Sequence, residues 1–508
     1  MGLIEDFRQE LGQFREMTEK FYKKEISMKE YKGFSGGFGS YAQKGGNANM
    51  LRLRMAGGRL TKEKLGFIVK SLKKYQINRL HFTTCQTVQL HDLLPETVYA
   101  LMEEALDYGI VTKGGGGDFP RNVMVSPLSG VEQGEYFDVL PYGEAAGDYL
   151  LSLIGSIKLP RKLKVGFSNT PANAVHATFR DLGFVATKEG TFDVYSAGGL
   201  GNNPRMGVCV AKGIAPDQIL YYIKAMVNTF MKYGNYENRA KARTRYMQET
   251  LGVEGYKNAY LSELEKVQKE EDLSICATPI KITKKGTKAV SLEDRMMEQK
   301  QEGLYTVSYH PIGGTPNPAS MIALYETVQD MDQVELRLSP DETVYIINLT
   351  EEEAKKVLEA TKDGAKTLIE SSVACIGNSI CQQGLRDSQA LLKKILVNTS
   401  DLKDGVLPRI HISGCVSSCG THQIGTIGFH GGVKRVDGTP CPAFTLHVNG
   451  ADHMGQERFG ESLGVITEED IPVFLRELGE TVEKANMTFA DWYPEHEDEF
   501  FQIAKKYL

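Results

Sequence analysis

The feature that most constrains the fold is an internal repeat, visible when the sequence is aligned with itself at an offset of 256 residues. Gly57-Gly58 then aligns with Gly313-Gly314, and the strand-like stretch 80–90 aligns with 336–346. Apolar residues at helical spacing also coincide, namely Leu65, Ile68, Val69 and Leu72 with Met321, Leu324, Tyr325 and Val328. Such spacing buries one face of a helix. The pattern predicts a small α+β domain that is present twice.

A second internal sequence similarity follows each copy of this small domain, at a slightly different offset. Residues 159–166, Leu-Pro-Arg-Lys-Leu-Lys-Val-Gly, resemble residues 407–414. Two internal similarities in the same order favour a duplicated chain, in which each half has a small α+β unit followed by a larger α+β unit. The connecting stretch 215–300 is charged and mostly helical in pattern. We predict an N-terminal arm at 1–45, small domains at 46–110 and 300–362, and larger domains at 111–280 and 363–508.

Composition excludes several functional classes. The 508 residues call for two or three domains, and 41% hydrophobic with 24% charged residues is ordinary for a globular protein. The net charge of −6 argues against nucleic-acid binding, which favours a basic balance. No apolar run approaches the ~18–20 residues that span a bilayer, and the first residues lack the pattern of a signal peptide. We therefore expect a cytoplasmic protein without a membrane or nucleic-acid partner.

Four of the eight cysteines lie close together in the sequence. Cys375 and Cys381 form a C-x5-C pair, and Cys415 and Cys419 form a C-x3-C pair. Clustered thiols in a reducing compartment indicate a metal site more than disulfides. Thiolates are the usual ligands of [4Fe–4S] clusters, whereas zinc pairs more often have two to four intervening residues. The spacing predicts an iron–sulfur cluster, with zinc or four unliganded thiols as the alternatives.

These cysteine pairs and three further segments resemble the sirohaem-containing nitrite and sulfite reductases. The segments are 118–123 (Asp-Phe-Pro-Arg-Asn-Val), 159–164 and 238–246, the last resembling a basic helix of that family. The resemblance extends from about residue 35 to the C-terminus. It implies an α+β fold with a pseudo-twofold duplicated architecture. Each half is then a ferredoxin-like half-domain followed by a larger α/β domain that binds sirohaem and the cluster.

The resemblance also implies the cofactors and the reaction. A [4Fe–4S] cluster is expected on the four cysteines, and Cys419, the last of them, is expected to bridge the cluster to the iron of a sirohaem. The implied enzyme is an oxidoreductase that carries out the six-electron reduction of sulfite to sulfide or of nitrite to ammonia, in an assimilatory role. No flavin or nicotinamide fingerprint is evident, so the electrons are expected from a separate ferredoxin or flavoprotein.

Basic residues are expected to hold the anion and the carboxylates of the sirohaem. By the resemblance, the catalytic cations are Arg121, Lys162 and Lys164, and the spacing of the two lysines places them on one face of a strand. In the alignment of the halves, these residues lie where the second half carries its cysteine pairs. The expected cofactor contacts are Arg52, Arg54, Arg161, Arg409 and His411, with ordinary surface charges as the alternative.

Two positions depart from the family pattern. Cys85, in Thr83-Thr84-Cys85-Gln86, stands where the family has a substrate-binding arginine, and we keep it as a candidate site residue. Loss of one cation weakens anion binding by about 1–3 kcal/mol in a desolvated site. The segment Cys415–Cys419 lacks the family's usual Pro-Asn, which leaves the ligands but affects the cluster potential. The segment that follows, 419–429, is more similar in sequence to the ferredoxin-dependent nitrite reductases. The sequence nevertheless leaves open whether the anion is nitrite or sulfite.

The sequence thus supports one principal hypothesis, a sirohaem- and [4Fe–4S]-dependent reductase of sulfite or nitrite. Cys85 motivates an alternative from another class, a sirohaem and iron–sulfur protein with weak turnover that acts as an anion sensor or electron-transfer partner. A structural module that binds only a cluster or zinc is a third hypothesis, and the basic segments argue against it.

Overall fold

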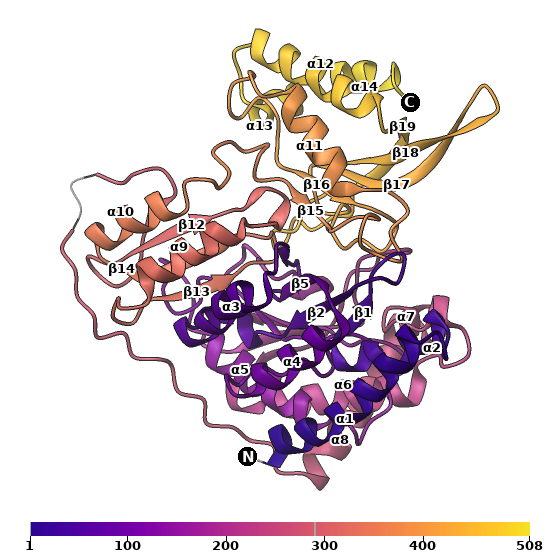
Figure 1. Cartoon of the computed structure of the whole chain (residues 1–508), viewed down its shortest axis with the longest axis vertical. Coiled ribbons are helices and arrows are strands. Elements are labelled where there is room, and N and C mark those ends of the chain that lie inside the picture. Colours follow the sequence, from indigo (N-terminus) through magenta and orange to yellow (C-terminus); the bar gives the residue numbers. More distant parts are fainter. Residues whose placement is uncertain (1, 289–290) are drawn as a thin grey trace. The chain divides into compact units, whose positions relative to one another are not determined.

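The computed structural model describes residues 2–288 and 291–508, which form two compact units. The first unit contains the residues up to Gly199 together with Pro204–Tyr309 and Pro316–Lys362, and the second contains Leu200–Asn203, His310–Thr315 and Asp363–Leu508. The described strands form four sheets, which can be followed by colour in Figure 1. None of the helices in the described ranges is long and apolar enough to cross a membrane.

The first small domain is an antiparallel sheet with the strand order β1-β2-β5-β4. Its elements are β1 (Ser40–Ala42), β2 (Asn49–Leu53), α3 (Lys62–Tyr75), β4 (Leu80–Phe82), β5 (Val88–Leu93) and α4 (Pro95–Leu106). Helix α3 begins after Thr61, whose hydroxyl accepts a hydrogen bond from the Lys64 amide. Its predicted apolar face is buried. The helices α1 (Gly2–Tyr22) and α2 (Met28–Ser35) precede this sheet, and α1 packs against α4.

The second small domain has the strand order β11-β12-β14-β13, all antiparallel, and β3 extends its sheet. Its elements are β11 (Met296–Glu298), β12 (Tyr305–Tyr309), α9 (Pro318–Val328), β13 (Glu335–Leu338), β14 (Val344–Leu349) and α10 (Glu351–Ala360). Helix α9 begins after Asn317, which caps it at the position equivalent to Thr61. Of its predicted apolar face only Tyr325 stays partly exposed. Both small domains share one hydrophobic core.

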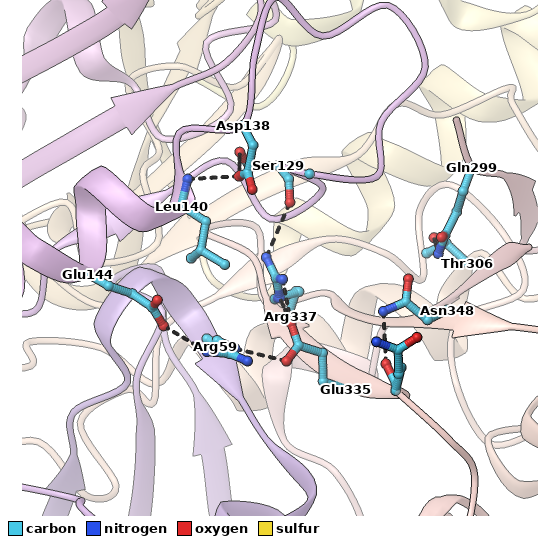
Figure 2. A network of polar contacts seen from close by, with 12 residues as sticks. Arg59, Ser129, Asp138, Leu140, Glu144, Gln299, Thr306, Glu335, Arg337 and Asn348 are labelled. Carbon is cyan, nitrogen blue, oxygen red and sulfur yellow. Dashed lines mark hydrogen bonds and ion pairs between the residues drawn. The ribbon is translucent and has the colours of Figure 1, made fainter. Parts of the chain in front are cut away.

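Strand β3 (Arg59–Leu60) ties the two small domains together by pairing with β13. Arg59 Nε donates to Glu335 at 2.8 Å and its Nη1 to Glu144 at 3.2 Å, while Arg337 pairs with Glu335 from the other side (Figure 2). Burial raises the pKa of the Glu335 carboxyl, but the two guanidiniums outweigh burial and bring it below its usual value. The network therefore fixes the register of β3 on β13 with a carboxylate that stays ionised.

The two larger domains are built on sheets with the same plan. In the first unit the order is β10-β9-β8-β7-β6, and in the second it is β15-β16-β17-β18-β19. In each sheet the first three strands along the chain are parallel and the last two pairings are antiparallel. The first set of strands is β6 (Met124–Val125), β7 (Val165–Ser168), β8 (Leu182–Ala186), β9 (Phe192–Ser196) and β10 (Val208–Ile214). The second set is β15 (Val373–Ala374), β16 (Ile410–Ser413), β17 (Ile427–Val436), β18 (Thr439–Val448) and β19 (Glu461–Thr467).

Helices cover these sheets in a corresponding order. The first domain has α5 (Leu140–Ser152) between β6 and β7 and α6 (Ile219–Tyr233) after β10, followed by α7 (Tyr246–Leu251) and α8 (Val253–Glu270). The second has α11 (Ser388–Asn398) between β15 and β16 and α12 (Asp470–Lys484) after β19, followed by α13 (Phe489–Trp492) and α14 (Glu497–Lys505). Each sheet has its own buried core. The predicted duplicated α+β fold is therefore confirmed.

The predicted repeat extends to single backbone conformations. Gly57 and Gly313 both have positive φ, 64° and 58°, as do Gly58 and Gly314, at 69° and 66°. The stretches 80–90 and 336–346, expected to be strand-like, are each a hairpin in which a tight turn separates two strands. In these turns Gln86 and Glu342 have φ values of 53° and 69°. Cys85 therefore lies in a turn and not within a strand.

Two further expectations need correction. The second internal similarity aligned Gly166 with Gly414. In the structure Gly166 corresponds to His411, because each lies opposite the first residue of the preceding parallel strand. The expected basic helix at 238–246 is not a continuous helix: it contains a short 3-10 turn, Arg239–Lys241, which Asn238 caps by accepting from the Ala240 amide. Arg239 pairs with Asp118, Arg243 with Asp181 and Lys241 with Glu249, so the basic side chains do not form one helical face.

Candidate functional site

Three of the predicted basic residues converge on the glycine-rich loop 113–121 of the first unit. Arg54 donates to the carbonyl oxygens of Lys113 at 2.9 Å and of Arg121 at 3.2 Å. Arg121 donates to the carbonyls of Gly115 at 2.9 Å and Gly117 at 2.7 Å, and Arg52 also donates to Gly115. A Cβ on Gly116 would lie 2.4 Å from the Gly36 carbonyl oxygen, so the loop packs closely only because glycine stands there.

The charges of these arginines are not cancelled by the bonds that orient them. Carbonyl oxygens carry no net charge, in contrast to the Glu335 carboxylate of the β3 network. Burial, together with the charge of a neighbouring arginine, lowers the pKa of Arg54 and of Arg121 to about 10, so both remain protonated at neutral pH. The Nε atom of Arg121 is buried and has no hydrogen-bond partner within the described residues. Such an arrangement is suited to an anion.

Cys85 lies in the β4–β5 turn beside this cluster. The turn is closed by the Gln86 amide donating to Thr83, and the buried Asn122 side chain donates to the carbonyls of Cys85 and Gln86, each at 3.1 Å. Burial raises the pKa of the Cys85 thiol, but the charges of Lys164, Arg180 and Arg52 and a hydrogen bond from Lys164 outweigh burial and bring it to about 6. At neutral pH Cys85 is therefore a thiolate within a cationic environment.

The two predicted catalytic lysines flank an extended residue that precedes β7. Leu163 forms a parallel bridge with Pro120 and is fully buried, whereas Lys162 and Lys164 are partly exposed, as the alternation predicts. The Lys164 amide donates to Asp181 at 2.8 Å, which anchors this segment. Arg161 is different, because its guanidinium pairs with Asp118 at 2.9 Å, a carboxylate that also pairs with Arg239.

Sequence reasoning missed two basic residues of this region, Arg180 and Arg243. Arg180 is 6% exposed, and it donates to the Val175 carbonyl at 2.7 Å and contacts His176 Nδ1 at 3.0 Å. It precedes β8 and has no motif around it, so only the fold reveals that its charge acts on Cys85. Arg243 pairs with Asp181 at 3.0 Å and lies in the basic segment that the sequence already singled out.

The cysteine pairs lie in the second unit, in the loops that follow β15 and β16. Backbone bonds join these loops, since the amides of Leu385 and Arg386 donate to the Gly414 carbonyl at 2.9 and 2.8 Å. The Gly414 amide in turn donates to Cys375 Sγ at 3.2 Å. A Cβ on Gly420 would lie 2.0 Å from the Ile412 carbonyl oxygen, so this position accepts only glycine. The fold thus brings both cysteine pairs into one region.

The chemistry of this region fits a group that binds thiolates. Burial, together with the nearby Cys419 sulfur, raises the pKa of Cys375 to about 12, so without a cation this thiol stays protonated. Ser418, between Cys415 and Cys419, adopts a left-handed conformation, and its buried hydroxyl has no partner among the described residues. An orphan hydroxyl beside clustered thiols suits inorganic sulfur as an acceptor.

The other two predicted cofactor contacts also lie in the second unit, on or next to β16. His411 contacts the Thr421 hydroxyl through Nδ1 at 2.8 Å, in the loop that carries Cys419. Arg409 Nε donates to the Ser371 hydroxyl at 3.1 Å. Both side chains therefore belong to the unit of the cysteines, whereas Arg52, Arg54, Arg121, Cys85, Lys162 and Lys164 belong to the other.

Two family models match the chain. The model described as "Nitrite/Sulfite reductase ferredoxin-like half domain" matches residues 41–108 and 297–364, the two small domains. The model described as "Nitrite and sulphite reductase 4Fe-4S domain" matches residues 116–268, in the larger domain that carries the cations. Together these ranges cover more than half of the chain.

Individual relatives are similar over most of their length. A ferredoxin–nitrite reductase from Synechococcus elongatus is 25% identical, over 84% of this chain and 85% of the relative. The haemoprotein beta-component of NADPH sulfite reductase from Bacillus licheniformis is 26% identical, over 75% of this chain and 73% of the relative. The solved structure of the Mycobacterium tuberculosis NirA protein has the same fold, with a TM-score of 0.75, 22% identity, and coverage of 91% of this chain and 89% of that one.

Proposed function

The chain belongs to the nitrite and sulfite reductase family, and from that premise we propose that it reduces a small oxyanion, nitrite or sulfite, by six electrons. The observation that carries the proposal is the set of guanidiniums on the loop 113–121. These cations are oriented by carbonyls and keep their charge, so they are available to hold an anion.

The cofactors of the family are a [4Fe–4S] cluster and sirohaem. We propose Cys375, Cys381, Cys415 and Cys419 as the cluster ligands, with Cys419 also bridging to the sirohaem iron. When bound, the cluster would supply electrons one at a time, and sirohaem would supply an iron with an open position for the anion. The joined loops, the nearness of the Cys375 and Cys419 sulfurs and the orphan Ser418 hydroxyl support this assignment.

The residues of the first unit have complementary tasks in this proposal. Arg121 and Arg54 attract the anion, and their fixed hydrogen bonds orient them before it arrives, so little reorganisation is needed. Lys164 and Cys85 are held together as an ammonium–thiolate pair, which can accept and return protons. Reduction of either anion consumes several protons as well as six electrons, so such groups are required.

Electrons are proposed to arrive from a separate protein, for which a ferredoxin is the donor named in several relatives. The alternative of a sensor with weak turnover receives no support from the relatives, which are named as reductases. The cytoplasmic location and the assimilatory role remain predictions from the sequence.

The proposal is tested on anaerobically purified, cofactor-replete protein. The absorption spectrum should show bands of an isobacteriochlorin together with a cluster. Reduced viologen should then drive steady-state reduction of at least one anion, with ammonium or sulfide as the product and six electrons consumed per molecule. Cofactor-replete protein that turns over neither anion would contradict the reductase function and favour the sensor. The ratio of the two values of kcat/KM decides between nitrite and sulfite.

A further inference from the structure

Three histidines of the second unit form a compact cluster outside the cysteine ligands. His422, His430 and His447 have ring centroids 4.8–5.0 Å apart, and one nitrogen from each lies within 4.8 Å of the other two. His422 and His447 are buried, at 1% and 8% exposure, and His430 is partly exposed. Three imidazole nitrogens that converge in this way resemble a metal site more than a chance contact in a core.

The strand register explains how two of these rings meet. In the β17–β18 ladder His447 lies opposite Gly428, and His430 lies opposite Thr445. Residues two apart on a strand share a face, so His430 and His447 are diagonal neighbours on one side of the sheet. Their closest ring nitrogens, His430 Nδ1 and His447 Nε2, are 2.8 Å apart.

Gly428 makes room for the third ring. A Cβ at this position would lie 1.9 Å from the His422 carbonyl oxygen, so any other residue would push the 420–426 loop off the sheet. With glycine there, the loop backbone rests on β17 and the His422 ring lies against the other two. The cluster is thus built by a strand register, a loop and a glycine acting together.

The outer nitrogens have partners that orient the rings. His422 Nδ1 contacts the Ser413 hydroxyl at 3.0 Å, and His447 Nδ1 contacts the Gly460 carbonyl at 3.4 Å. Histidines that bind metals commonly donate their other ring N–H to such acceptors. The Gly460 carbonyl can only accept, so its contact keeps the proton of His447 on Nδ1. In the metal-free cluster His447 Nε2 then accepts a hydrogen bond from His430 Nδ1, and a bound ion would replace this hydrogen bond. His430 then presents Nδ1. Burial is the largest influence on all three rings and lowers the pKa of each, that of His430 to about 4, so the donors are neutral.

We infer that His422, His430 and His447 form a binding site for a divalent transition-metal ion, with zinc as the ion that the donor set favours. Neutral imidazoles suit zinc, which binds nitrogen at about 2.0–2.1 Å and accepts three histidines with a fourth position open to water. Tetrahedral geometry places ligand nitrogens roughly 3.3 Å apart. His430 Nδ1 and His447 Nε2, which are 2.8 Å apart, would therefore separate slightly when the ion binds. The partly exposed His430 provides the entry path.

The site also has a connection to the loop that carries Cys419. The Ser413 hydroxyl that contacts His422 accepts the amide of Gly420 at 3.0 Å. An ion bound to His422 would therefore hold this loop against β17 and β18. The inference does not depend on the proposed reductase function, because it concerns other side chains and another ligand.

Zinc K-edge absorption on the holoenzyme tests the site, because iron does not contribute at that edge. The protein is treated with a chelator, incubated with a small excess of zinc, and freed of unbound ion by gel filtration. We expect about one zinc per chain, with three imidazoles at about 2.0–2.1 Å. Retention of less than about a tenth of an equivalent, or zinc–sulfur scattering at about 2.3 Å from the cysteines, would overturn the inference.

Matched variants locate the bound ion. His430→Gln and His447→Gln should lose the zinc, whereas His453→Gln, a change at an exposed histidine of the same unit, should retain it. Zinc should also raise the Tm of the wild type and of His453→Gln but not of the cluster variants, since an ion bound only to the folded state stabilises it. Equal zinc content and equal Tm shifts in all four proteins would refute the assignment.

Discussion

The two larger domains share one sheet plan but carry their chemistry at opposite ends of equivalent strands. In the first unit, Arg121 precedes β6 and Lys164 precedes β7, so the predicted cations lie at the amino ends of parallel strands. In the second unit, Cys375 follows β15 and Cys415 follows β16, at the carboxyl ends. The sequence alignment, which placed cations and cysteines at the same positions, is wrong on this point.

This difference shows how a duplicated scaffold acquires two tasks. The connection from β16 to β17 carries Cys415, Cys419 and His422, whereas the equivalent connection from β7 to β8 carries Arg180. Loops after parallel strands vary freely because they leave the core unchanged. One larger domain carries the proposed sulfur ligands, and the other carries the proposed cations. The following variants test whether the two sets contribute separately to turnover.

The largest effect is expected from Cys419→Ser. If Cys419 bridges cluster and haem, its loss should uncouple their spectroscopic signals and lower kcat at least about a thousandfold, or about 4 kcal/mol. The coupling is measured by electron paramagnetic resonance and the rate with a reduced viologen. Cys441→Ser, on β18 in the same unit, is the control and should keep both properties. Coupling that survives in Cys419→Ser excludes the bridging role.

Arg121→Gln tests the larger domain of the first unit, which carries the cations. It should weaken mainly the binding of the anion. Loss of a charged donor from a desolvated site costs about 1.5–3 kcal/mol, which corresponds to a fall in kcat/KM of about 10–150-fold. The cluster and haem spectra should not change, in contrast to Cys419→Ser. Arg79→Gln, at a partly exposed residue paired with Asp92, is the matched control. A variant that loses cofactor instead of anion affinity would place Arg121 with the sirohaem.

Cys85→Arg restores the residue that the family pattern has in this turn. It removes a negative charge and adds a positive one, so we expect nitrite to bind about tenfold more tightly, a gain of about 1.4 kcal/mol. The dissociation constant is measured from the change in the haem absorption on titration with nitrite. An affinity equal to that of the wild type would show that Cys85 lies outside the anion site.

The sequence predicted the features of the fold that depend on local pattern. The apolar faces of α3 and α9 and the paired glycines appear at the predicted offset, because helix periodicity and left-handed backbone conformations require particular residue types. The cysteine spacing likewise identified two loops that the fold brings together. Arg52, Arg54 and Arg121, which the resemblance singled out, converge on one loop.

What the sequence did not predict depends on contacts between distant segments. The turn at Cys85 contains no glycine, and it forms because the Gln86 side chain is held by the backbone of Val125 and Leu338. The histidine cluster has no sequence spacing of its own, since a strand register and a glycine bring its rings together. Arg180 acts on Cys85 only through the fold.

The smallest expected effect is a pH dependence that separates Cys85 from the surrounding cations. With a pKa of about 6, the thiol is neutral below that pH and a thiolate above it, so nitrite binding by the wild type should weaken as the pH rises through 6. One added charge on the partly exposed Cys85 changes the affinity by about threefold to tenfold. Nitrite itself stays ionised over this range.

The control is Cys85→Ser, whose hydroxyl does not ionise over this pH range. Its dissociation constant for nitrite should therefore stay constant from about pH 5 to about pH 8. If both proteins gave the same profile, another group would be titrating, and the cations of the first unit would bind the anion without any influence from Cys85.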